Sequence, residues 1–236
     1  MPTTAALPTD SYSPECKEIY EWGGNGEKTN PTRIILAAGY GTTATHALFQ
    51  YYGDKGLRTV HWKQTLNLST KEKAAWLALH SQLSSLSPHD LSNFDFRVLH
   101  QIADVFIDEP IPDLIAHLYR AYPNALVILT HRDPLQWAEK RQQEHHNSPT
   151  PFANYFTSIS NIEKNRFDKK TMLLQPKVNT WSIASLMYSL HITMVRCLVK
   201  KGDLVEIDYF KDDPKDIENK LLTAAYLKNE SVTEIQ

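Results

Sequence analysis

One segment near the start of the chain constrains the fold more than any other. An apolar run, Arg33-Ile-Ile-Leu-Ala37, leads into Gly39-Tyr40-Gly41-Thr42-Thr43, and a helix-like stretch follows over residues 44–52. A strand that enters a helix through such a turn directs backbone N–H groups and the positive end of the helix dipole into one concavity. The threonine hydroxyls can donate to phosphate or sulfate oxygens, and glycine lets the backbone approach closely. The segment predicts an anion-binding turn, with an ordinary threonine-capped turn as the alternative.

The glycine turn differs from the loop that binds ATP in many nucleotide hydrolases. That loop needs glycine, four residues, and then Gly-Lys-Ser/Thr. No lysine occurs between Arg33 and Lys55. A nucleotide kinase or ATPase is therefore the least favoured of the enzyme classes that the turn admits.

The rest of the chain alternates strand and helix patterns. Residues 125–130, Ala-Leu-Val-Ile-Leu-Thr, are apolar on both faces, as in a central strand of a parallel sheet. The alternation predicts an α/β protein with a three-layer P-loop-like fold, in which a central parallel sheet is flanked by helices. Further strands are expected at 59–62, 105–108 and 204–208, and helices at 71–86, 112–122, 134–145, 180–201 and from about residue 213.

The boundaries of the domain follow from composition. Residues 1–32 are rich in Pro, Thr, Ser and Gly without an apolar period, so we expect a flexible lead-in. A single α/β domain is then expected over residues 33–228, with a C-terminal tail at 229–236.

Charge and composition exclude several classes of protein. The net charge of −2 argues against a general nucleic-acid binder, which needs an excess of Lys and Arg. The first ten residues lack the pattern of a signal peptide, and no apolar run approaches the ~18 residues that a membrane helix needs. We therefore expect a cytoplasmic protein without membrane segments. The two cysteines, Cys16 and Cys197, are not expected to form a disulfide.

Three separated motifs occur in an order that resembles the sulfotransferase superfamily, and its compact branch in particular. The most specific motif is the segment 122–134, Tyr-Pro-Asn-Ala-Leu-Val-Ile-Leu-Thr-His-Arg-Asp-Pro, with Trp137 three residues on. Phe106-Ile107-Asp108-Glu109-Pro110 lies upstream of it, and Gly41-Thr42-Thr43 follows the first strand. A long helix and strand ending at Asp208 extend the likeness over most of the chain.

The resemblance implies a co-substrate and a reaction. Members of the family move a sulfuryl group from 3′-phosphoadenosine 5′-phosphosulfate to a hydroxyl or amine of a small-molecule acceptor, and no metal is expected. In the family a Lys-x-Gly-Thr-Thr loop grips the 5′-phosphosulfate, and a strand ending in Arg-Asp-Pro places an arginine on the 3′-phosphate. The positions of this chain that would bind the donor are Gly39, Tyr40, Gly41, Thr42, Thr43, Arg132 and Lys140, the last in place of a serine.

One departure from the family bears on catalysis. The lysine that precedes Gly-Thr-Thr by two places is Gly39 here. That lysine touches the bridging oxygen as the leaving group departs, and an electrostatic contact of this kind is typically worth ~3 kcal/mol. Two readings stay open: a working sulfotransferase, and a catalytically impaired nucleotide-binding or interaction protein of the same fold.

The resemblance also suggests a general base for the acceptor. Asp108 stands where the family places its base, and the alternatives are Glu109 and His46. His61 ends another strand and is a further candidate for ligand contact. Two structural interpretations compete with these roles: Asp108 as the cap of the helix near residue 112, and Arg132 as the ion-pair partner of Asp133 or a neighbouring carboxylate.

Two charged clusters receive structural interpretations. Adjacent histidines on a helix diverge by about 100°, so Glu144-His145-His146 is interpreted as a solvated helix end and not as a metal site. The cationic run 163–170 either folds over the donor or forms solvated surface.

Overall fold

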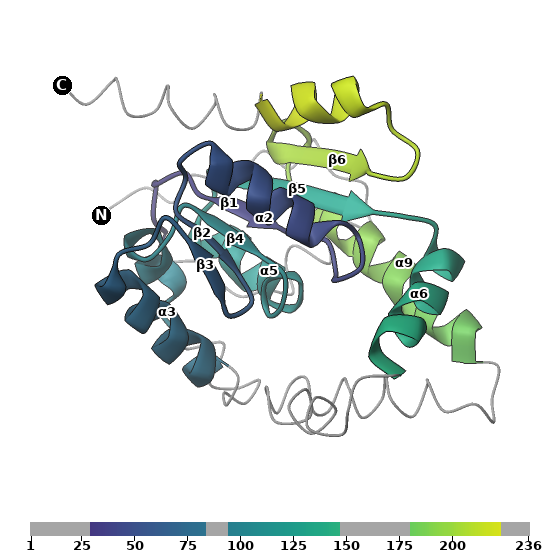
Figure 1. Ribbon diagram of the computed structural model, residues 1–236, viewed down its shortest axis with the longest axis horizontal. Coiled ribbons are helices and arrows are strands. Elements are labelled where there is room, and N and C mark those ends of the chain that lie inside the picture. Colours follow the sequence, from purple (N-terminus) through teal and green to yellow (C-terminus); the bar gives the residue numbers. More distant parts are fainter. Residues whose placement is uncertain (1–28, 84–93, 147–179, 223–236) are drawn as a thin grey trace, which may run out of the picture.

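A six-stranded sheet with helices on both faces forms the centre of the computed structural model, which describes residues 29–83, 94–146 and 180–222 (Figure 1). The strand order is β3-β2-β4-β1-β5-β6. The strands are β1 (Ile35–Ala37), β2 (Thr59–His61), β3 (Gln64–Leu66), β4 (Val105–Ile107), β5 (Leu126–His131) and β6 (Leu204–Asp208).

The predicted α/β fold with a central parallel sheet is confirmed. β1 lies at the centre, where Ile35 is in register with Val105 of β4 on one side and with Leu126 of β5 on the other. The outer pairs β2–β4 and β5–β6 are also parallel. Only β3, a short edge strand that the sequence did not predict, runs antiparallel to its neighbour β2.

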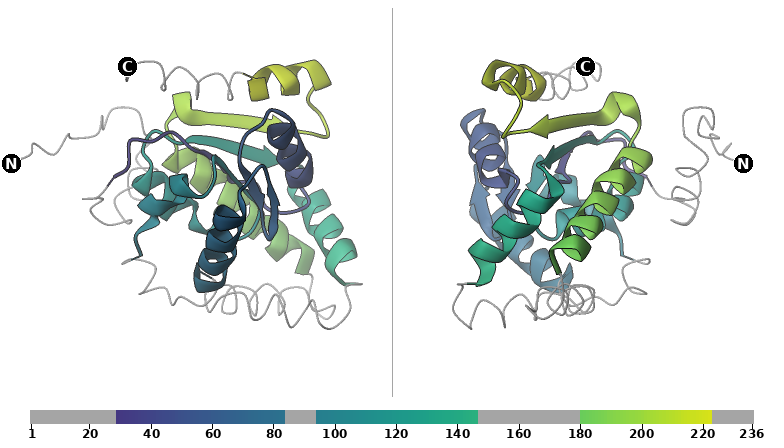
Figure 2. Two further views of the ribbon diagram at one scale, coloured as in Figure 1. Left: turned by 60° about the vertical axis from the view of Figure 1, so that its left-hand side comes forward. Right: turned by 90° about the vertical axis from the view of Figure 1, so that its right-hand side faces the viewer.

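Helices cover the sheet on two sides, and Figure 2 shows α2 and α9 on opposite sides of it. On one side, α2 and a helix over residues 214–222 pack on inward-facing residues of β1, β4 and β5. On the other side, α3, α5 and α9 enclose a second core cluster around Leu36, Phe106 and Val127. The labelled helices are α2 (Thr45–Asp54), α3 (Thr70–Leu83), α5 (Ile111–Ala121), α6 (Pro134–His146) and α9 (Thr180–Leu198), with 3-10 turns η2 (Phe96–Gln101) and η3 (Lys201–Asp203).

Two features differ from what the sequence suggests. Asn30, within the predicted lead-in, is fastened to the domain: its N–H donates to the carbonyl of Ala121 at 2.7 Å. Cys197 in α9 is disulfide-bonded, so the expectation that it stays free is wrong; the other cysteine, Cys16, lies outside the described residues. Within the parts of the chain that are described, no helix is long and apolar enough to cross a membrane.

Candidate functional site

The carboxyl ends of the parallel strands converge on one edge of the sheet. The glycine loop, residues 38–44, follows β1 there, while Asp108 follows β4 and Arg132 follows β5. His61, the last residue of β2, pairs in register with Ile107, which directly precedes Asp108. Ligands of parallel α/β sheets bind at this edge. The fold therefore brings the glycine loop and three of the single residues identified in the sequence, His61, Asp108 and Arg132, to one edge of the sheet.

The glycine loop leaves the amino end of α2 open. Ala44, the N-cap residue, has left-handed backbone angles (φ 68°, ψ 27°), and no side chain caps the helix. Uncapped first-turn N–H groups together with the helix dipole attract an anion. The hydroxyl oxygen of Thr42 is buried and has no hydrogen-bond partner in the described structure. A buried polar atom without a partner needs an explanation, and a bound anion at this loop supplies one.

Two other side chains of the loop face inward. The Thr43 hydroxyl donates to the Tyr40 carbonyl at 2.6 Å and lies 2.8 Å from the Thr130 hydroxyl. The Tyr40 hydroxyl donates to Asp113 at 2.7 Å. Both residues were expected to bind the donor, and their side chains are instead held within the protein. Donor binding by the backbone N–H groups of Tyr40 and Thr43 stays a prediction, because these contacts involve only their side chains.

An aromatic cluster fastens the loop to α6 and α9. The Trp137 indole N–H of α6 donates to the Gly41 carbonyl at 3.1 Å, and Nε2 of His191 in α9 lies 2.7 Å from the Ala38 carbonyl oxygen. The Trp137 ring stacks on Tyr188 of α9 with centroids 4.3 Å apart and an interplanar angle of 6°. Tyr40 packs against the His191 ring at 4.3 Å. The loop is therefore held in one conformation by residues from two distant helices.

Both loop glycines are required by close neighbours. A Cβ on Gly39 would overlap the Thr130 hydroxyl and lie 2.5 Å from the Thr130 carbonyl oxygen. A Cβ on Gly41 would run into Nη1 of Arg141 and lie 3.3 Å from Oδ1 of Asp108. Gly39 thus faces β5, whereas Gly41 faces the charged residues of the sheet edge.

Arg132 reaches from the end of β5 to the loop. Its Nη1 donates to the Thr42 carbonyl at 3.2 Å, and its guanidinium lies 3.9 Å from the ring centroid of Phe210. Its Nε is buried and has no hydrogen-bond partner in the described structure. Asp133 does not pair with Arg132 but accepts from the N–H of Leu135 at 3.0 Å, capping α6. The interpretation of Arg132 as the ion-pair partner of Asp133 is therefore wrong, and no ion pair of Arg132 occurs among the described residues.

Asp108 faces the loop and β2. Its Oδ2 lies 3.5 Å from Nε2 of His61, and Asp108 adopts a left-handed φ of 67°. The N-cap of α5 is Pro110, without a side-chain cap, so the capping interpretation of Asp108 is wrong. Burial lowers the pKa of His61 below its usual 6.5, although the Asp108 carboxylate opposes that shift. The hydrogen-bond partner of His61 Nε2 is the Thr45 hydroxyl, at 3.2 Å.

The predicted residues His46 and Lys140 are exposed, whereas Arg141, which was not predicted, lies next to the glycine loop. His46 is exposed, with its ring 5.7 Å from that of His61. Lys140 is exposed on α6. The next residue, Arg141, instead lies at Gly41 and pairs with the buried Glu109, with Nη2 3.2 Å from Oε1. The available signal was helical spacing, because Arg141 is four residues after Trp137 and so shares its face of the helix.

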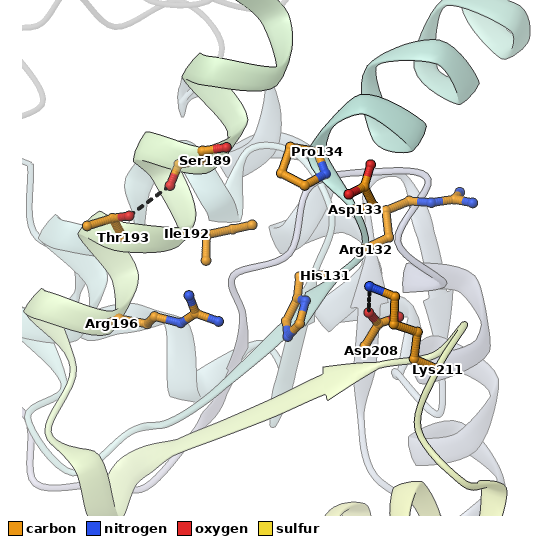
Figure 3. Close-up of a pocket in the computed structure, with 10 residues that line it drawn as sticks. All are labelled: His131, Arg132, Asp133, Pro134, Ser189, Ile192, Thr193, Arg196, Asp208 and Lys211. Carbon is orange, nitrogen blue, oxygen red and sulfur yellow. Dashed lines mark hydrogen bonds and ion pairs between the residues drawn. The ribbon is translucent and has the colours of Figure 1, made fainter.

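A cavity of about 290 Å³ lies next to this site, between α9 and the ends of β5 and β6 (Figure 3). Two of its lining cations have carboxylate partners: Arg196 lies 2.6 Å from Glu206, which is outside the lining, and Lys211 lies 3.6 Å from Asp208. Figure 3 shows the Arg132 side chain turned away from α9, toward the glycine loop. Arg132 also lines this cavity, so the cavity adjoins the side chain whose Nε has no hydrogen-bond partner in the described structure.

Comparison with known families agrees with the geometry. The family model described as "Sulfotransferase domain" matches residues 34–212, which include the glycine loop, Asp108, Arg132 and β6. The chain belongs to the sulfotransferase family. No curated protein matches it. Within this sulfotransferase domain the described residues hold no cluster of three or more metal-ligating side chains. The side chains of Glu144-His145-His146 and the whole run 163–170 lie outside the described residues.

Proposed function

We propose that the protein transfers a sulfuryl group from 3′-phosphoadenosine 5′-phosphosulfate to a hydroxyl or amine of a small-molecule acceptor. The observation that carries the proposal is the open amino end of α2, which faces two arginines and one carboxylate at the same sheet edge. A transferase of an anionic group needs donors for the anion and a base for the acceptor. The cytoplasmic location stays a prediction.

The residues present fit the two anionic ends of such a donor. The unpartnered hydroxyl of Thr42 and the first turn of α2 suit the 5′-phosphosulfate. Nε of Arg132, unpartnered at the end of β5, suits the 3′-phosphate. Arginine presents several donors in one plane and matches phosphate oxygens well.

In the proposed reaction, Asp108 accepts the proton of the acceptor as its oxygen or nitrogen attacks sulfur. The carboxylate faces the loop from the end of β4, and Nε2 of His61 lies 3.5 Å from it. His46, on the first turn of α2, is the alternative base. The remaining rate enhancement comes from alignment of the acceptor with the bound sulfuryl group.

A second function is favoured by one observation: no Lys or Arg occurs in the loop or in α2. A protein that binds the nucleotide without turning it over would keep the anion site and tolerate this loss. The two functions predict the same binding and different chemistry.

The test begins with binding. Adenosine 3′,5′-bisphosphate, which has both phosphates and no sulfuryl group, should raise the melting temperature more than ATP does. A ligand at 100 times its dissociation constant adds ~2.7 kcal/mol, which corresponds to roughly 5–10 °C for a domain of this size. Equal or absent shifts with both nucleotides would contradict the donor assignment. Sulfuryl transfer from labelled donor to a panel of phenols, alcohols and amines then separates enzyme from binding protein.

A further inference from the structure

Sulfuryl transfer calls for a positive group at the reacting end of the donor. As the bond between sulfur and the bridging oxygen breaks, negative charge grows on the 5′-phosphate, and a fixed cation there accelerates the reaction. The glycine loop supplies none, and neither do the flanking elements, since residues 34–54 contain no Lys or Arg. The position of the expected lysine, Gly39, faces β5, where any side chain would collide with Thr130.

The backbone also argues for a different alignment of the loop. The residue that takes the glycine-like left-handed conformation directly before α2 is Ala44 (φ 68°), whereas Gly41 does not have a positive φ. Aligning Ala44 with the glycine of Lys-x-Gly-Thr-Thr puts Thr42 in the place of the lysine. Thr42 carries no charge either, so under both alignments the cation has to come from another element.

Arg141 of α6 lies where that cation is needed. Its Cζ would be 3.5 Å from a Cβ built on Gly41, and its Nη1 would be closer still. The side chain is only 17% exposed, and Nη2 is bound to Glu109, whose side chain is 7% exposed. Nη2 is the atom committed to Glu109, so the guanidinium retains further N–H donors at Nη1 and Nε.

Asp108 lies on the same side of Gly41. Its Oδ1 is 3.3 Å from the Cβ position at which Arg141 also converges. Base and cation therefore flank one point above the loop, next to the amino end of α2. Arg132 contacts the loop at a different point, the Thr42 carbonyl, and stacks on Phe210. The two arginines thus have separate positions around the loop.

We propose that Arg141 is a catalytic residue that replaces the loop lysine, an inference that rests on the proposed function. The acceptor oxygen forms a bond to sulfur, the bond from sulfur to the bridging oxygen breaks, and its electron pair stays on the 5′-phosphate of adenosine 3′,5′-bisphosphate. The acceptor proton passes to Asp108. Arg141 donates hydrogen bonds to the bridging and sulfuryl oxygens while this charge develops, and Glu109 holds its guanidinium in place.

The test removes the cation without leaving a buried carboxylate unpaired. Arg141→Gln alone would strand Glu109, which is strongly destabilising, so the informative protein is the double variant Glu109→Gln/Arg141→Gln. Calorimetry with adenosine 3′,5′-bisphosphate and with the sulfated donor measures binding, and circular dichroism monitors the fold. We expect affinity for both nucleotides to fall by about tenfold, because the bridging oxygen stays on the 5′-phosphate of the bisphosphate, and kcat to fall further, by about 10²–10³.

Three further variants sharpen the comparison. Arg141→Lys keeps a cation, and its rate should be at least about tenfold above that of the double variant. If the double variant does not fold, the rate of Arg141→Lys relative to wild type provides the comparison. Glu109→Gln alone keeps Arg141 and should lower the rate less than the double variant does. Arg97→Gln removes an arginine that pairs with Asp95 at 2.6 Å before β4, far from the loop, and should leave binding and rate unchanged.

The outcomes separate this inference from the proposed function. If wild type binds neither nucleotide, the proposed function is wrong and the role of Arg141 with it. If wild type binds both and transfers sulfuryl groups while the double variant does so equally well, only the role of Arg141 is wrong. A double variant that loses affinity for both nucleotides and keeps the wild-type kcat would also overturn it, because Arg141 would then bind the nucleotide without acting on the reacting bond.

Discussion

Replacing Gly39 by alanine tests how closely the glycine loop sits on β5. The new Cβ would overlap the Thr130 hydroxyl, and it would lie 2.5 Å from the Thr130 carbonyl oxygen and 2.9 Å from the Thr43 hydroxyl. A hydroxyl can rotate away, but the carbonyl belongs to the backbone of β5, whose Thr130 is in register with Ile207 of β6. The loop must therefore lift from the strand.

The expected loss of stability follows from these contacts. Overpacking a tight site costs about 1–3 kcal/mol, and contact with fixed backbone puts this case at the upper end. Lifting the loop also weakens the bond between the Thr43 and Thr130 hydroxyls, which contributes about 1 kcal/mol. A loss of about 3–4 kcal/mol should lower the melting temperature by roughly 6–16 °C.

Thermal unfolding followed by circular dichroism measures the change, with urea unfolding as a second assay. Gly202→Ala is the matched control, because a Cβ there meets nothing within 4 Å; its stability should change by less than about 0.5 kcal/mol. Gly39→Lys, which would restore the residue expected from the family, should destabilise at least as much as alanine. If Gly39→Ala melts within about 2 °C of the control, the close seating of the loop on β5 is refuted.

Three further predictions concern charge. Arg132→Ala should weaken binding of adenosine 3′,5′-bisphosphate by about tenfold or more in calorimetry, while the melting temperature changes little; unchanged affinity would remove its role at the 3′-phosphate. Asp108→Asn should lower turnover about 100-fold at near-native stability, since no helix depends on it as a cap; full turnover would move the base to His46 or Glu109. Burial lowers the pKa of His80 to about 4 from 6.5, so the unfolded chain binds the proton first and stability falls as pH drops from 6.5 to 4. This group contributes a slope of up to ~1.4 kcal/mol per pH unit, which His80→Gln should remove in urea titrations; an identical slope in the variant would contradict the assignment.

The parts of the fold that depend on local pattern were predictable from sequence. Two segments indicate buried parallel strands by themselves: the apolar run before Gly39, and residues 125–130, which are apolar on both faces and correspond to β5. The second segment also places Arg132 at the sheet edge. Helix α2 was expected from residue 44, but Ala44 takes the left-handed conformation and the helix begins at Thr45. The edge strand β3, Gln64-Thr65-Leu66, is short and partly polar, and it is defined by pairing with β2 more than by its own residues.

The parts that depend on tertiary contacts were not predictable. Thr43 looks like an anion ligand in sequence, yet its hydroxyl partner, Thr130, is 87 residues away along the chain. Lys140 and Arg141 are neighbours in sequence, and it is the packing of α6, with Trp137 bonded to the Gly41 carbonyl and Arg141 paired with Glu109, that directs Arg141 toward the loop. The pattern around a motif predicts its place in the sheet, whereas the direction of each side chain depends on packing that no single segment contains.

The aromatic fastening of the glycine loop has a consequence for how variants of this protein should be interpreted. His191 contacts the Ala38 carbonyl across 153 residues of chain, and Tyr188 supports Trp137, which holds the Gly41 carbonyl. The loop therefore loses its conformational entropy when the chain folds. Binding of an anion then does not require further ordering of the loop, which favours affinity. A substitution of Tyr188 or His191, buried residues on a distant helix, should consequently behave in binding assays as a defect of the loop itself.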